Sequence, residues 1–314
     1  MTRPDRRQIL AGLGMGLVAG CAPGQGDLAD GKRPPAEGGI GGTGIVGVVT
    51  ALGSIKVGGQ RVLLPADAEL SDTFGAIGPS AIQPGHSVTA EVATVDGSLV
   101  ARRVRLTHPL IGPLVRRDGA FQVLGVQIVP EPDVDVPAVP RVAVSGLWWG
   151  DRVIASRIDP VAENTPAAIA GERPLDGAQA IGPLTVAFPA EEAIEPGSFA
   201  TVIGRETPRG LFATQIEPGR FFGSAGPLEQ LLIEGYLDPV SKAPGFAVAG
   251  LGHSFDPASR LDNLATGRVL FTGPYTGLFA VSHGLPLPED PARRQEVLDG
   301  AGSPGTDPAF VPTR

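Results

Sequence analysis

Apolar and polar residues alternate in short runs along the chain, and turn residues separate these runs. In the opening run, 44–51, Ile45 and Val49 fall on one face of an extended strand, while Val46 and Val48 fall on the other. Both faces are therefore apolar. A strand of this kind is typical of a small barrel or sandwich, in which both sides of the sheet are covered.

The pattern repeats. Four segments begin with Pro-Gly or a substitute, continue as an alternating strand, turn on Gly and end in a strand that contains an alanine; they span 84–104, 140–158, 196–216 and 266–283. The marker alanines are Ala101, Ala155, Ala213 and Ala280, separated by 54, 58 and 67 residues. A shorter apolar hairpin precedes each segment, at 44–64, 111–129, 169–188 and 233–252. Such spacing indicates tandem structural units, each with the order β-β-loop-β-β.

We therefore predict an all-β protein of about four small barrel units, with the bounds 44–108, 109–162, 163–222 and 223–285. Residues 21–43 are rich in Gly and Pro and are predicted to be a flexible tether. The Pro-rich tail 286–314 is expected to be mostly disordered, with at best a short helix near Ala292–Leu298.

A family resemblance accompanies this pattern. The hairpin G-x-V-T-A-x-G-x-x-x-V-x-G at 47–59, followed by P-G-x-x-V and a hairpin ending in A-x-x-V, is similar to the domain-of-unknown-function family 5666, which occurs in tandem on exported bacterial proteins. The stretch Gly44 to Leu106 matches best, and the resemblance extends over about 44–285. It implies an OB-like topology. The family offers no established catalytic residues to transfer.

Residues 1–20 have the organisation of an export signal, with basic residues followed by an uncharged stretch from Ile9 to Gly20. That stretch is too short to span a bilayer, which takes about 20 apolar residues. Arg6 and Arg7 resemble a twin-arginine motif, although Asp5 stands where Ser or Thr is usual. Export by the twin-arginine route or by the general route both remain open.

Val18-Ala19-Gly20-Cys21 resembles the lipobox of bacterial lipoproteins, in which the cysteine is acylated after cleavage. The alternative is a plain secretory signal with an incidental cysteine. Acyl chains on Cys21 would anchor the protein to a membrane without crossing it. We therefore expect a periplasm-facing lipoprotein, and Ala22 after the cysteine resembles the default for sorting to the outer membrane.

The composition argues against several classes of site and partner. Cys21 is the only cysteine, so a lipidated chain has no thiol for disulfides, metal sites or nucleophilic catalysis. Removal of residues 1–20 removes three Arg and one Asp, so the net charge changes from −8 to −10 (22 basic against 32 acidic residues). An acidic chain without a basic run argues against nucleic-acid binding.

Candidate chemistry is sparse. His283 occupies the repeat position held by Val104, Ile158 and Ile216, where it is either a ligand or proton-transfer group or, as we favour, a partly buried histidine at the end of the last strand. His86 is expected at the surface. His108 lies in a link between units and His253 in a Gly-rich turn, and neither has a second histidine at metal-ligand spacing.

Two acidic runs, Glu131-Pro-Asp133-Val-Asp135 and Glu191-Glu192, lack the loop pattern of a Ca²⁺ site and are predicted to be solvated. No G-x-S-x-G nucleophile motif is present, and the glycines at 38–44 are not followed by the Lys of a phosphate loop. We therefore assign no catalytic residue, metal or cofactor.

The aromatic pair Trp148-Trp149 falls at a predicted hairpin tip, and Tyr275 falls near the equivalent tip of the last unit. Exposed at one turn, the pair could stack on sugars or bind a protein. The alternative, which we favour, is that at least one tryptophan covers its own barrel or packs between units, because tryptophan is highly buried on average.

The sequence thus predicts a non-catalytic binding or scaffold module of the cell envelope, with a glycan or an envelope protein as partner. The alternative is an envelope enzyme that acts on a polymer or small metabolite through His283 and nearby carboxylates.

Overall fold

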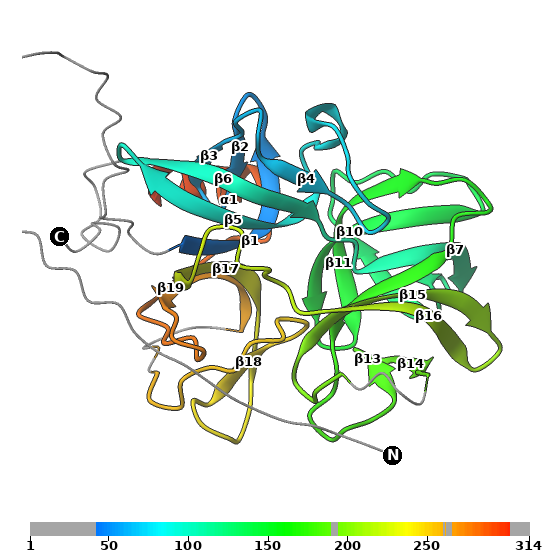
Figure 1. The fold of residues 1–314 in the computed structure, drawn as a ribbon. Coiled ribbons are helices and arrows are strands. Elements are labelled where there is room, and N and C mark those ends of the chain that lie inside the picture. Colours follow the sequence, from blue (N-terminus) through cyan, green and yellow to red (C-terminus); the bar gives the residue numbers. More distant parts are fainter. Residues whose placement is uncertain (1–41, 190–193, 260, 262–265, 302–314) are drawn as a thin grey trace, which may run out of the picture. The chain divides into compact units, whose positions relative to one another are not determined.

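A computed structural model describes residues 42–189, 194–259, 261 and 266–301 of the chain. These residues form two ten-stranded sheets and an α-helix (Figure 1). The prediction of an all-β protein built on small barrels is confirmed. Arg6, Arg7, Cys21, the greater part of the tether and Glu191-Glu192 lie outside the described residues.

The first sheet combines strands from the beginning and the end of the described chain: β1 (Gly42–Ala51), β2 (Ile55–Val57), β3 (Gln60–Leu63), β4 (Glu69–Ser71), β5 (Ser87–Val95), β6 (Ser98–Leu106), β17 (Leu228–Pro239), β18 (Phe246–Val248), β19 (Gly267–Pro274) and β20 (His283–Pro286). A 3-10 turn, Pro79–Ala81, precedes β5, and α1 (Pro291–Ala301) follows β20.

The second sheet contains the middle of the chain: β7 (Leu110–Arg117), β8 (Ala120–Val123), β9 (Val126–Pro130), β10 (Arg141–Trp149), β11 (Arg152–Pro160), β12 (Ala167–Glu172), β13 (Ala180–Ile181), β14 (Leu184–Ala187), β15 (Phe199–Thr207) and β16 (Gly210–Pro218).

Two sets of five strands close into barrels. In the first barrel, strand pairing runs β1-β2-β3-β6-β5 and back to β1, and only β3 and β6 pair in parallel. In the second barrel, it runs β7-β8-β9-β11-β10 and back to β7, with β9 and β11 parallel. This strand order with its one parallel pair is the OB-like arrangement.

The remaining strands follow the pattern less closely. In the third segment, β12 to β16, the order β12-β15-β16-β14-β13 is the same, and a hydrogen bond of 2.8 Å from the Gly182 N–H to the Glu172 carbonyl links its ends. The last segment, β17 to β20, has a different order, β18-β17-β19-β20. The expected two-stranded opening hairpins were wrong for the first three segments, because each folds as three strands.

The repeated alanines mark a β-bulge. The ladder between the last two strands shifts register just before the residues that face Ala101, Ala155 and Ala213. All three alanines are buried in the barrel cores. At the second bulge the two backbones approach closely, because a Cβ added at Gly146, opposite Ala155, would lie 2.0 Å from the Ile154 carbonyl oxygen. The repeat residue therefore serves the fold.

Strands from segments far apart in the chain also pair with each other. β1 pairs in parallel with β17, with Ile45 opposite Leu232, although they are separated by most of the chain. β7 pairs antiparallel with β12. Each ten-stranded sheet therefore joins two segments, and the segments are not independent beads.

The C-terminal segment belongs to this core. The helix expected near Ala292–Leu298 is present within α1. The expected disorder of the tail was wrong up to Ala301, because Leu287 and Leu298 are buried in the same apolar cluster as Val57 and Leu270. The Leu298 carbonyl oxygen would lie 2.5 Å from a Cβ at Gly59, so the helix docks on backbone that must be glycine.

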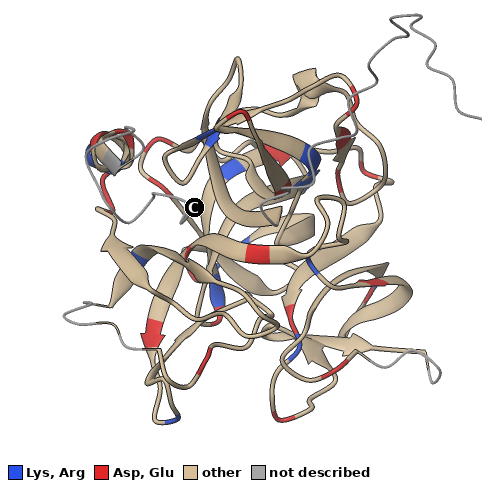
Figure 2. Ribbon diagram, turned by 60° about the vertical axis from the view of Figure 1, so that its left-hand side comes forward, with Lys and Arg blue, Asp and Glu red and all other residues tan. Residues whose placement is uncertain are grey.

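Charged residues are dispersed over this fold, with basic positions scattered among acidic ones along the ribbon (Figure 2). Within the described part of the chain, none of the helical segments combines the length and the hydropathy that crossing a membrane takes.

Candidate functional site

Trp148 fills the junction between three segments. It lies near the end of β10, is 6% exposed, and its indole N–H donates a hydrogen bond of 2.9 Å to the Ala170 carbonyl of β12. A Cβ at Gly250, in the last segment, would lie 2.2 Å from the indole ring. Gly250 also has a φ of +69°, so both the close approach and the backbone require glycine. Trp148 is thus a packing residue, as the favoured sequence alternative held.

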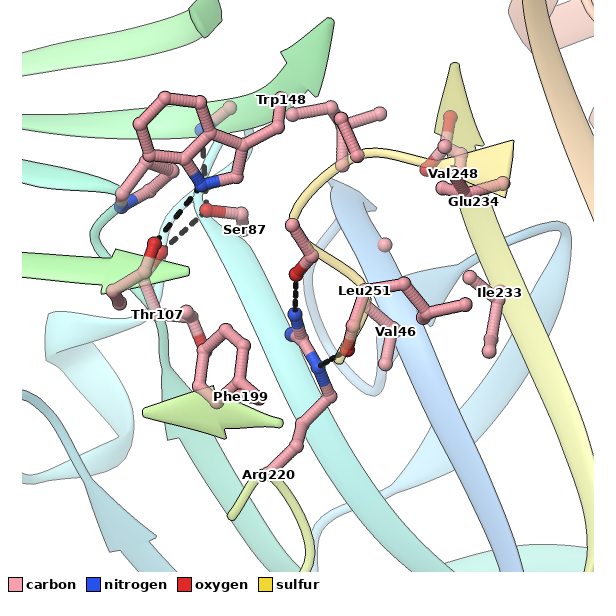
Figure 3. A pocket seen from close by; sticks show the side chains of 18 of the residues that line it. Val46, Ser87, Thr107, Trp148, Phe199, Arg220, Ile233, Glu234, Val248 and Leu251 are labelled. Atoms are coloured by element: carbon pink, nitrogen blue, oxygen red, sulfur yellow. Dashed lines mark hydrogen bonds between the residues drawn. The ribbon is translucent and has the colours of Figure 1, made fainter. Parts of the chain in front are cut away.

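Arg220 lies on the opposite side of the same junction, in the link between β16 and β17 (Figure 3). Its guanidinium donates to the carbonyls of Gly250 (2.6 Å) and Leu251 (3.2 Å), and its carbon atom lies 3.8 Å from the centre of the Phe199 ring. Burial lowers the pKa of Arg220 to about 9. The same burial raises the pKa of Glu172, the nearest counter-charge.

Between Trp148 and Arg220 lies a small cavity of about 40 Å³ (Figure 3). A water molecule occupies roughly 10–15 Å³ on this measure, whereas ligand pockets span about 300–1,000 Å³. The cavity has room for a few waters only. Arg220 is committed to backbone carbonyls, so the junction stabilises the fold and offers no ligand site.

A second polar centre is a buried ionic cluster. Arg268 of β19 is 2% exposed and pairs with Glu234 at 2.8 Å and also with Glu131. Arg294 of α1 binds the other oxygen of Glu131 at 2.5 Å. Glu234 in turn accepts the backbone N–H of Val48 at 2.9 Å. The cluster joins both barrels, the last segment and the helix.

This cluster corrects the expectation of a solvated acidic run at Glu131 alone, since Asp133 and Asp135 of the same run are exposed as expected. The Glu131 side chain is 10% exposed, and its carboxylate binds two arginines. Burial works against the charge of Arg268, but Glu234 and Glu131 outweigh it, and the net effect raises the pKa of Arg268. The sequence could not reveal this, because the partners lie more than 100 residues away.

The candidate binding site is an open groove of about 470 Å³ between the second barrel and the third segment. Four hairpin tips line it. Two come from the second barrel, at 122–127 and Asp151, and two from the equivalent places of the third segment, at 183–185 and 209–210. Gly210 permits two of the tips to meet, because a Cβ there would lie 2.1 Å from the Thr185 carbonyl oxygen.

Five polar side chains line this groove beside four apolar ones, and four of the five polar side chains have no side-chain partner among the described residues. Gln122 and Gln127 are directly opposite on β8 and β9, so their amides project from one face of the hairpin. Neither amide, nor the Thr185 hydroxyl, nor the Arg209 guanidinium makes a side-chain hydrogen bond or ion pair among the described residues. Asp151 lies 3.6 Å from its neighbour Arg152.

No family model, no curated protein and no solved structure matches this chain. The resemblance to family 5666 therefore stays a prediction, and the function must be argued from the residues themselves.

Two of the four histidines lie side by side, because the ring centres of His86 and His108 are 6.2 Å apart. His86 also corrects the sequence expectation. His86 was expected at the surface, but it is 5% exposed at the contact between the two barrels. Its Nε2 pairs with Asp159 at 2.9 Å, and its Nδ1 accepts the Gln83 backbone N–H at 3.0 Å. Both ring nitrogens are occupied, which leaves none for proton transfer to a substrate. Burial works to raise the pKa of Asp159, but hydrogen bonds from His86 and Arg157 outweigh it and hold the pKa at about 2.

His108 and His253 are also enclosed. The Nδ1 of His108 lies 3.3 Å from the Thr73 hydroxyl, and burial lowers the pKa of His108 to about 4. The Nδ1 of His253 lies 3.3 Å from the Tyr275 hydroxyl, and burial lowers the pKa of His253 to about 4 as well. Both imidazoles are therefore neutral at physiological pH.

His283 is exposed at the start of β20, and its described polar contact is with Ser282, at 3.3 Å. The expectation of a partly buried histidine was wrong, because β20 presents this side chain to solvent. Among the described residues, no group of three or more His, Cys, Asp and Glu could hold a metal ion.

The aromatic residues do not form one platform. Trp149 is 39% exposed, but it stacks on Tyr236 with ring centres 5.1 Å apart, on the side of the last segment. Tyr275 packs against His253 in a separate apolar cluster. Trp148 is buried, so the two tryptophans are not both exposed at one turn, which agrees with the favoured alternative that at least one of them packs inside.

The groove itself was missed by the sequence analysis, which searched for histidines, carboxylates and tryptophans. The available signal was the cross-strand glutamine pair beside the Leu124-Gly125 turn. Leu124 and Gly125 have φ values of +55° and +80°, the conformation of a tight two-residue hairpin. Such a turn places Gln122 opposite Gln127.

Proposed function

We propose that the protein is a lipoprotein of the bacterial cell envelope, held by acyl chains on Cys21 and facing the periplasm, whose barrels act as a non-catalytic binding module. The lipobox before Cys21 supports the anchor, and Ala22 supports the outer membrane as the destination. The observation that carries the binding function is the groove, in which polar groups from two barrel segments converge, most of them without a side-chain partner among the described residues.

The polar residues elsewhere in the described fold favour this reading over the enzyme alternative. Charged side chains at the segment contacts, such as Arg268 and Arg220, are engaged with one another or with backbone. His86 has no free ring nitrogen, and His283 stands apart from any described carboxylate cluster. A reaction site with an acid, a base and a cleft has no support from these positions.

Two experiments on the full chain in a bacterium with an outer membrane test the proposal. Cys21→Ser should move the protein from the membrane fraction to the soluble periplasmic fraction, because the acyl chains are lost. Retention in the membrane fraction would contradict the anchor.

The second experiment tests the groove. A photo-crosslinking residue at Thr185 should capture an envelope component in intact cells, whereas the same residue at Gln215, exposed on β16 outside the groove, should not. Equal labelling at both positions, or none at Thr185, would contradict a binding function of the groove.

A further inference from the structure

We infer that the groove between the second barrel and the third segment binds a neutral polyhydroxylated ligand, the chemistry of a glycan chain. This inference rests on the proposed binding function and adds the class of ligand. The observation behind it is that one groove of about 470 Å³ is lined by hydrogen-bond donors and acceptors, those of Gln122, Gln127, Asp151, Thr185 and Arg209.

The groove offers the hydrogen-bond donors and acceptors that a polyhydroxylated ligand needs. Each sugar hydroxyl both donates and accepts, so a site for several neighbouring hydroxyls must offer both functions. The two amides provide donors and acceptors, Asp151 provides acceptors, and the Arg209 guanidinium provides donors. The Thr185 hydroxyl does either. The cross-strand position of Gln122 and Gln127 places two planar amides side by side, at the spacing of neighbouring residues in a sheet.

An apolar ligand fits poorly, because it would cover these polar groups without replacing their bonds to water. Among the apolar side chains of the groove, Val126 and Leu184 are turned into the barrel cores and are 4% and 7% exposed, whereas Leu124 is half-buried and Pro183 is exposed. None of the described residues that line the groove is aromatic, so binding to them would depend on hydrogen bonds without stacking.

Charged ligands fit less well than a neutral one. Arg209 and Asp151 give the lining one positive and one negative charge, which offset each other. A divalent cation such as Ca²⁺ takes about six to eight oxygen ligands, and the lining that the described residues form has a single carboxylate. A nucleic acid would meet a processed chain with a net charge of −10 (22 basic against 32 acidic residues).

Ligand-observed NMR on the processed, detergent-solubilised protein tests this inference. The probes are neutral hexasaccharides of glucose, mannose and N-acetylglucosamine, an acidic oligogalacturonate of the same length, and alanine as a small zwitterion. We expect saturation transfer to at least one neutral hexasaccharide. Gln122→Ala/Gln127→Ala should weaken its binding about tenfold, because two side-chain hydrogen bonds are lost.

Gln215→Ala, an amide removed from the exposed face of β16, is the matched control and should bind as the wild type does. Asp151→Asn and Arg209→Gln should each weaken the binding of the neutral probe less than the double glutamine variant does, and by similar factors. Unfolding curves for every variant separate lost binding from lost structure.

Each of the following outcomes overturns the inference: no neutral probe binds; the double glutamine variant binds as the wild type does; or the oligogalacturonate binds more tightly and its binding is lost with Arg209→Gln alone. A zwitterion that binds in place of the glycans would also overturn it. If the Thr185 crosslink in cells persists in any of these cases, the binding function stands and only the ligand class is wrong. If that crosslink is also absent, both fail.

Discussion

The ionic cluster around Arg268 and the groove beside Gln122 are both polar regions between barrel segments, yet they differ in how their polar groups are used. In the cluster, each carboxylate oxygen of Glu131 binds an arginine, and the Arg268 side chain is 2% exposed. In the groove, the amides and the guanidinium face solvent without described partners. Buried charges must be paired to be stable, whereas exposed unpaired groups bind water and remain available to a ligand. Polar residues at a contact between segments can therefore either stabilise the fold or form a binding surface, and their burial distinguishes the two roles.

The largest effect should come from Arg268→Met. The substitution leaves Glu131 and Glu234 buried without their shared partner, a change that typically costs about 3–5 kcal/mol. Urea unfolding followed by circular dichroism should show a much lower midpoint. Arg152→Met, at an exposed pair on a hairpin, is the control and should change the midpoint little. Equal midpoints for Arg268→Met and the wild type would show that the cluster does not hold the segments together.

The next effect separates the two tryptophans. Trp148→Ala leaves a cavity at the junction and should cost about 3–5 kcal/mol, whereas Trp149→Ala removes a half-exposed ring and should cost about 1 kcal/mol. The chain has two tryptophans, so each variant also reports on the other by fluorescence. Emission from Trp148 in Trp149→Ala should be blue-shifted and resist iodide quenching. Ready quenching of Trp148 would contradict its burial.

A smaller effect should appear on acidification. Burial lowers the pKa of His108 from 6.5 to about 4, so the unfolded chain binds a proton more readily than the folded chain between these values. The free energy of unfolding should therefore decrease as the pH falls from 6.5 to about 4, and His253 adds to this decrease in the same window. Asp159 contributes at lower pH. Its pKa is about 2 in the folded protein against 3.8 in the unfolded chain, so its stabilising effect is lost as the pH falls below 3.8.

His108→Gln removes one of these groups and should make the decrease between pH 6.5 and pH 4 shallower by an amount on the order of 3 kcal/mol. The measurement is urea unfolding at a series of pH values. His283→Gln, at an exposed histidine, should keep the wild-type slope. A slope unchanged by His108→Gln would mean that His108 is protonated in the folded protein.

The smallest effect on stability should come from the groove. Gln122→Ala/Gln127→Ala removes side chains without described partners, so the free energy of unfolding should change by less than about 0.5 kcal/mol per site while ligand binding weakens about tenfold. Unfolding curves beside binding data check this. A destabilisation as large as that of Arg268→Met would erase the distinction between the two regions.

Much of the fold could be predicted from the chain. Apolar residues on both faces of 44–51 predicted a barrel strand, and the spacing of Ala101, Ala155 and Ala213 predicted repeated units. The alanines recur because each faces a bulge within its own hairpin, which is a local constraint. The short helix at Ala292–Leu298 was predictable for the same reason, since helix propensity is local.

The candidate site was mostly beyond such reasoning. Glu131 looked like a loop carboxylate, and His86 looked like a surface residue, because neither position shows its partner in the neighbouring sequence. Their partners, Arg268 and Asp159, lie 137 and 73 residues away. Likewise, the groove exists only because the second barrel and the third segment place their hairpin tips together.

The sequence by itself thus determined the type of fold, the repeat and the alanine at each bulge, all of which depend on residues close in the chain. Short linear patterns also carry the prediction of an export signal in residues 1–20 and of lipidation at Cys21, and both stay predictions. The tertiary structure decided which polar residues are buried and paired and which remain available in the groove. The physical reason is that desolvation and hydrogen bonding depend on what surrounds a side chain, and here those surroundings come from strands far apart in sequence.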